Sequence, residues 1–132
     1  MHQEHFPIRV YLEDTDAGGI VFNGSYINYF ERARTEYLRA RGIQQHTWLA
    51  QGIQLVVSRL ECRYMRPARL DDLLHVVTWI SLQKKVLYRF SQEVWRGEEL
   101  LVCGEADIAC LSTTTGRPIR YPADFVQRLG NA

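Results

Sequence analysis

A helix-period segment followed by four strand-period segments constrains this chain more than any other feature. Between residues 25 and 41, aromatic and apolar side chains recur at spacings of four, three and four residues: Tyr26, Phe30, Ala33 and Tyr37. Such spacings place them on one face of an α-helix. Gly42 is a typical helix stop, and either Asn23 or Ser25 is a suitable N-terminal cap. We therefore predict one long amphipathic helix here.

The remainder of the chain indicates a sheet. Strand-like segments cover about 54–66, 73–83, 86–96 and 100–112, with a hairpin near Gly97. A shorter alternation with apolar Ile8, Val10 and Leu12 predicts one more strand near the N-terminus. Segments 47–51 and 122–129 predict a helical turn and a last short helix. One long helix with a mostly antiparallel sheet is an α+β architecture, in which the helix covers the apolar face of the sheet.

Composition limits the classes of protein. We expect a single domain over residues 1–132, whose 46% hydrophobic content is enough for a buried core. Sixteen basic against 15 acidic residues give a net charge of +1, which argues against a nucleic-acid partner. No apolar run approaches the roughly 20 residues of a membrane-spanning helix, and the first residues are polar. We therefore expect a cytoplasmic protein with no transmembrane segment and with free cysteines at positions 62, 103 and 110.

Four segments together carry a family resemblance. They are EDTDAGGIVF at 13–22, YINYFERARTE at 26–36, PARLDD at 67–72 and RPIRYP at 117–122. The chain resembles the hotdog-fold thioesterases of the 4-hydroxybenzoyl-CoA thioesterase family, and most closely the branch associated with the Tol-Pal gene cluster of Gram-negative bacteria. The resemblance extends from about residue 8 to residue 125. It implies a long central helix wrapped by a five- or six-stranded antiparallel sheet, and a homodimer or homotetramer with active sites between subunits.

The resemblance also implies an activity and a catalytic residue. The expected reaction is hydrolysis of the thioester of an acyl-CoA, or of an acyl-carrier protein, to a free acid and a thiol without any metal or cofactor. The second aspartate of the D-x-D turn is catalytic in the family, and here it is Asp16. An aspartate in such a turn is also commonly structural, which is the role that we expect for Asp14.

The chemistry of the residues agrees with this assignment. A carboxylate serves as general base or as nucleophile in acyl transfer. The start of the predicted helix leaves backbone N–H groups free, so a thioester carbonyl placed over the N–H of Asn23 or Gly24 would be polarised. Gly24 allows a close approach of the backbone. Position 23 is usually histidine in the Tol-Pal branch, and the amide of Asn23 could hold water or orient the thioester, but could not act as a base.

Lys84 and Lys85 stand where the resemblance places basic residues near the phosphates of coenzyme A. The alternative is that both are solvated lysines that protect a strand end.

Two other functions compete with hydrolysis. A hotdog dehydratase or hydratase usually needs a histidine on or near the central helix, and none occurs between His5 and His46. A non-catalytic module that binds acyl thioesters or acyl-carrier protein, linked to envelope lipid metabolism, is compatible with asparagine at position 23. The sequence leaves open the acyl chain, the choice between coenzyme A and acyl-carrier protein, and whether Asp16 is nucleophile or base.

Overall fold

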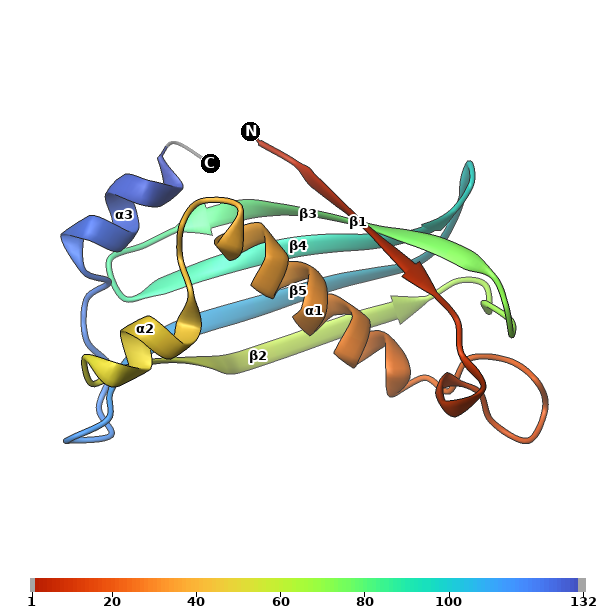
Figure 1. The fold of residues 1–132 in the computed structure, drawn as a ribbon, viewed down its shortest axis with the longest axis horizontal. Coiled ribbons are helices and arrows are strands. Elements are labelled where there is room, and N and C mark those ends of the chain that lie inside the picture. The colour runs from red at the N-terminus through yellow and green to blue at the C-terminus, as the bar shows by residue number, and fades with distance from the viewer. Residues whose placement is uncertain (1, 131–132) are drawn as a thin grey trace.

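The computed structural model describes residues 2–130, which form an antiparallel sheet crossed on one face by a helix (Figure 1). The sheet has five strands in the order β1-β3-β4-β5-β2. The strands are β1 (Glu4–Arg9), β2 (Ile53–Tyr64), β3 (Leu73–Gln83), β4 (Leu87–Arg96) and β5 (Glu99–Ser112). The helices are α1 (Ser25–Arg39), α2 (Gln45–Ala50) and α3 (Ala123–Leu129). This arrangement confirms the α+β prediction with the smaller of the two expected strand numbers.

Helix α1 lies across the sheet with its predicted apolar stripe inward, and all four residues of the stripe are buried. The helix approaches β5 so closely that a Cβ atom on Gly104 would lie 2.7 Å from Cε2 of Phe30. Such a distance is shorter than any normal van der Waals contact, so glycine is required at this position. The helix ends at Arg39, and Gly42 adopts a left-handed φ of 76° just beyond it, as expected of a helix stop.

The N-terminal strand corrects the sequence prediction. Strand β1 ends at Arg9, three residues before Leu12, which lies in the short 3-10 helix η1 (Leu12–Asp14) and is 73% exposed. Just after the strand, the N–H of Val10 donates a hydrogen bond to the carbonyl of Asp72 at 2.9 Å. The chain then turns away from the sheet. The alternation of apolar residues in the sequence therefore extends to Leu12, although the strand has already ended.

The predicted caps of α1 are also wrong. Gly24 occupies the N-cap position, and no side chain caps the helix. Ser25 instead donates its hydroxyl to the carbonyl of Asp14 at 3.0 Å, and Asn23 directs its side-chain oxygen to the N–H of the next residue. Both candidates thus bind backbone groups, but not those of the first helical turn.

The remaining predictions differ from the structure mainly at the ends of elements. The three cysteines are free as expected, although Cys110 alone among them is fully buried. No helix within residues 2–130 is long and apolar enough to cross a membrane.

Candidate active site

The loop before α1 is held in place by Asp14. This buried carboxylate accepts the backbone N–H of Tyr11 at 2.8 Å, and the Asp14 carbonyl accepts the N–H of Phe22 at 2.8 Å. Burial and the nearby Asp14 carboxylate both raise the pKa of Tyr29, whose hydroxyl has no hydrogen-bond partner within residues 2–130. The predicted structural role of Asp14 is therefore confirmed: it connects η1, the loop and the start of α1.

Asp16 lies at the exposed end of this loop. Its Oδ1 accepts the N–H of Gly18 at 2.8 Å, and its own N–H donates to the carbonyl of Ile20 at 2.9 Å. The second carboxylate oxygen has no hydrogen-bond partner within the described chain. One oxygen thus maintains the turn while the other is free to contact water or a substrate.

A pocket of about 280 Å³ opens beside the start of α1. Its lining includes Asn23 and Tyr26, together with Tyr64 at the end of β2 and Met65 directly after it. The Tyr64 hydroxyl donates to the carbonyl of Asn23 at 3.1 Å, which ties the strand end to the loop. The Asn23 N–H has no partner within residues 2–130, whereas the Gly24 N–H is bound by the Asn23 side chain at 3.0 Å.

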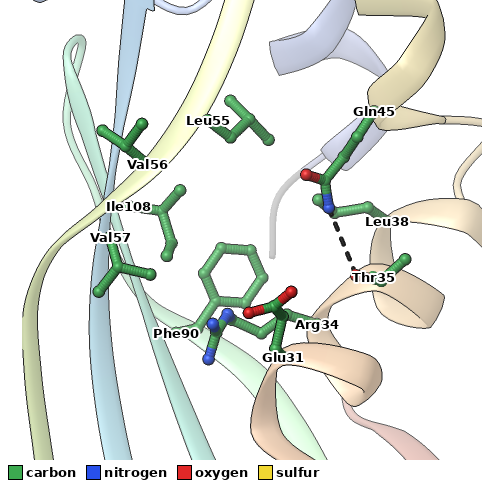
Figure 2. A pocket seen from close by; sticks show the side chains of 10 residues that line it. All are labelled: Glu31, Arg34, Thr35, Leu38, Gln45, Leu55, Val56, Val57, Phe90 and Ile108. Carbon is green, nitrogen blue, oxygen red and sulfur yellow. Dashed lines mark hydrogen bonds between the residues drawn. The ribbon is translucent and has the colours of Figure 1, made fainter. Parts of the chain in front are cut away.

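A second cavity, of about 290 Å³, lies farther along α1 between the helix and β2 (Figure 2). Its apolar wall includes Leu38, Leu55, Val57, Phe90 and Ile108, and its polar residues are Glu31, Arg34, Thr35 and Gln45. We call it the Arg34 cavity. Sequence analysis did not single out Arg34, although it follows Phe30 by four residues and precedes Tyr37 by three. This spacing puts it on the buried face of the helix.

Lys84 and Lys85 lie in the turn between β3 and β4, and both are exposed. The Asp16 loop contacts the opposite end of the sheet, where Val21 donates to the carbonyl of Ala68 (Figure 1). Strand β4 has 10 residues between these two ends. At about 3.3 Å per residue, it separates them by roughly 30 Å. Within one chain the lysines and Asp16 are therefore not brought together.

Comparison with known proteins places the chain in a family. The model of the thioesterase superfamily matches residues 18–103. The chain belongs to the thioesterase superfamily. A superfamily relative, "Acyl-CoA thioesterase YbgC" of Haemophilus influenzae, is 42% identical over 120 residues, which cover 90% of this chain and 88% of the relative. "Acyl-CoA thioester hydrolase YbgC" of Escherichia coli O6:H1 is 37% identical over 123 residues, covering 92% and 91%.

Solved structures of thioesterases have the same fold. A probable thioesterase from Bartonella henselae superposes with a TM-score of 0.86 at 36% identity, covering 92% of this chain and all of that one. The DHNA-CoA thioesterase of Staphylococcus aureus superposes with a TM-score of 0.93 at 25% identity, covering 97% and 89%. The predicted hotdog fold is thereby confirmed, while the association with the Tol-Pal cluster stays a prediction.

Proposed function

We propose that this chain hydrolyses the thioester bond of an acyl-CoA, releasing a free acid and a thiol. The observation that carries the proposal is the arrangement at the start of α1, where the free oxygen of Asp16 and the free N–H of Asn23 belong to one short loop. The two relatives named as acyl-CoA thioester hydrolases, which align along about nine-tenths of the chain, support the same reaction.

The Asn23 N–H is the group that would polarise the thioester. Its hydrogen is unpaired within the described residues, and the N-terminal end of α1 adds partial positive charge. A carbonyl oxygen bound there is stabilised as it becomes an oxyanion. The Gly24 N–H joins the Asn23 N–H only when the Asn23 side chain turns away from it.

Asp16 would supply the hydrolytic step in one of two ways. As a general base it takes a proton from water while the water oxygen attacks the carbonyl carbon, and the carbon–sulfur bond then breaks to release the thiol. As a nucleophile it attacks the carbonyl carbon and expels the thiolate, which leaves an acid anhydride that water hydrolyses in a second step. Both routes require the carboxylate to be ionised, and neither requires a metal ion.

We expect the site to be completed by the association of two copies. Strand β2 is an edge of the sheet, and it exposes Val57 (48%) and Leu60 (38%). Exposed apolar edges are normally paired or covered. We propose that two chains pair along β2 in a homodimer, or in a homotetramer built from it, which covers the cleft between α1 and β2. In such an assembly Lys84 and Lys85 of one chain would serve coenzyme A at the site of another. The cytoplasm stays our expected location.

The alternative is a non-catalytic module that binds acyl thioesters or acyl-carrier protein. The observation that favours it is the pairing of the Gly24 N–H with Asn23, because this pairing occupies one of the amides that an oxyanion would use. Incubation of the purified protein with a panel of acyl-CoAs, with free thiol measured over time, separates the two functions. Hydrolysis supports the enzyme, whereas tight binding with no thiol release would support the module and contradict our proposal.

A further inference from the structure

Arg34 is a buried cation with few partners. Its exposure is 7%, and no ion pair within 4.0 Å involves it in residues 2–130. Its Nη1 donates to the side-chain oxygen of Gln92 at 3.1 Å, the one side-chain hydrogen bond of this guanidinium in the described structure. A guanidinium has five N–H donors, and a buried charge without compensation is costly. The described chain therefore leaves most of the hydrogen-bonding capacity of Arg34 unused.

Gln92 holds Arg34 in this position. The Gln92 amide nitrogen donates to the carbonyl of Phe30 at 2.9 Å and to Oγ1 of Thr78 at 3.0 Å. These two bonds direct the Gln92 oxygen at the guanidinium, so the arginine is fixed by a buried network and not by chance packing. The free nitrogens of Arg34 are not among the fully buried unpaired atoms of the described chain, and the residue lines the cavity.

The cavity around Arg34 is large enough for an acyl group. Its volume is about 290 Å³, whereas an apolar cavity of about 150 Å³ already admits a benzene ring. In Figure 2, Arg34 and Glu31 reach from α1 toward Phe90, with Leu55 and Val57 of β2 facing them across the space. The site thus combines an apolar wall with one fixed cation.

We infer that the Arg34 cavity binds the acyl group and favours acyl groups that end in a carboxylate, whose oxygens pair with the free N–H groups of Arg34. This inference rests on the proposed function and adds a substrate class to it. An anionic end neutralises the buried charge, which an alkyl end leaves uncompensated. Glu31 is exposed and makes no ion pair with Arg34 in the described structure, so it is free to turn toward solvent when such a ligand enters.

The distance along the helix determines which substrates test the inference. Eleven residue steps, nine of them within α1, separate position 23 from position 34, or about 16 Å at 1.5 Å per residue. A thioester bound in the same chain would need a medium-length acyl group to reach Arg34. If the thioester is bound at the start of α1 in the paired chain, the acyl length that reaches Arg34 depends on the geometry of the dimer. Two acyl lengths are therefore tested.

The experiment compares matched acyl-CoAs that differ only in the terminal carboxylate: adipyl-CoA with hexanoyl-CoA, and sebacyl-CoA with decanoyl-CoA. Dissociation constants are measured by calorimetry on the Asp16→Asn protein, which should leave the acyl-CoAs uncleaved during the measurement. The value of kcat/KM is measured on the wild-type protein. We expect the carboxylated ligand to bind at least about tenfold more tightly in one or both pairs, as a charge-assisted hydrogen bond would provide. Addition of Arg34→Met should abolish this preference, and addition of the exposed Arg32→Met should leave it unchanged.

Two outcomes would overturn the inference. One is equal binding within both pairs, and another is a preference for the carboxylate that survives Arg34→Met. Failure of the proposed function looks different, because the protein with Asp16 would then release no thiol from any of the four acyl-CoAs.

Discussion

The side-chain oxygen of Asn23 accepts a hydrogen bond from the backbone N–H of Gly24 at 3.0 Å. The protein itself thus occupies one of the two amides that the sequence pointed to as an oxyanion site. The Asn23 N–H is free within residues 2–130, so we expect a thioester carbonyl to meet this amide first. In the proposed mechanism, the Asn23 side chain turns away from the Gly24 N–H, which exposes the second amide and lets the side chain hold the attacking water.

The free oxygen of Asp16 makes this residue the most direct test of the mechanism. Asp16→Asn keeps an acceptor for the Gly18 N–H but removes the negative charge. We expect kcat to fall by at least ~10²-fold, the lower range for a positioned proton transfer. The free energy of unfolding should change by less than ~1 kcal/mol, because the bond that maintains the turn remains. Steady-state kinetics and thermal unfolding measure the two effects.

Asp16→Ala is the control for the turn. It loses both the charge and the bond to Gly18, so it should be as inactive as Asp16→Asn and less stable by about 1 kcal/mol. An Asp16→Asn protein that hydrolyses acyl-CoA at nearly the wild-type rate would show that this aspartate is a turn residue and not a catalytic one.

The side chain of Asn23 should contribute less to kcat than that of Asp16, and we expect both to act on the same water molecule. Asn23→Ala preserves the backbone N–H, so we expect kcat to fall by about 3- to 10-fold, the value of one neutral hydrogen bond. Because both side chains would act on one water molecule, the double variant Asp16→Asn/Asn23→Ala should be little slower than Asp16→Asn alone. The values of kcat are compared for the four proteins of this double-mutant cycle: the wild type, the two single variants and the double variant. Fully additive losses would mean that the two side chains act independently.

The role of the lysines can be tested by mixing chains that lack Asp16 with chains that lack the two lysines. Lys84 and Lys85 lie at the far end of the sheet from Asp16 of their own chain, so we predict that they serve the site of another. The change of both lysines to alanine should raise KM with little effect on kcat, and the effect should shrink with salt. Oligomers that combine an Asp16→Asn chain with a double-alanine chain contain one intact site and should recover low-KM activity.

A short pantetheine thioester, which lacks the nucleotide phosphates, is the control for these lysines. The double-alanine variant should hydrolyse it like the wild-type protein. If the mixed oligomers show only the high KM, the lysines and Asp16 that form one site belong to the same chain. If light scattering finds only a monomer, no site is shared between chains.

The ion pair between Arg89 and Asp107 should make the free energy of unfolding depend on pH in the acidic range. Two hydrogen bonds from the Arg89 guanidinium, at 2.7 and 3.2 Å, lower the pKa of Asp107 although burial opposes them. A carboxyl group with a depressed pKa adds stability above its unfolded pKa of about 3.9, and this part is lost as the pH falls through the folded pKa. The free energy of unfolding should therefore decrease below about pH 4.

Asp107→Asn should flatten this acid dependence and lower stability at neutral pH. The matched control is Asp124→Asn, because Asp124 pairs with Arg128 on the surface with 59% of its side chain exposed. Exposed pairs contribute little to stability, so this variant should follow the wild-type curve. Thermal unfolding from about pH 3 to about pH 7 compares the three proteins. Identical curves for Asp107→Asn and the wild type would contradict the prediction.

Several features of the fold were predictable from sequence because they depend on local spacing. The stripe from Tyr26 to Tyr37 identified both the helix and its buried face, and the left-handed glycine at position 42 followed from the residue type. Local spacing failed for Leu12, because the chain leaves the sheet at Val10 through contacts with residues 71 and 72. It also failed for the helix caps, because Ser25 binds the carbonyl of Asp14 instead.

The sequence by itself determined the helix, the long strands and the loop that carries Asp16, since short-range periodicity and turn chemistry decide these elements. The tertiary structure alone decided which residues distant in sequence lie together and which lie apart. The bond of Arg34 to Gln92 joins residues 58 positions apart, and the separation of Lys84 from Asp16 follows from the order of strands in the sheet. Such distances depend on strand register and on the close approach of α1 to Gly104, which no periodicity along the chain encodes.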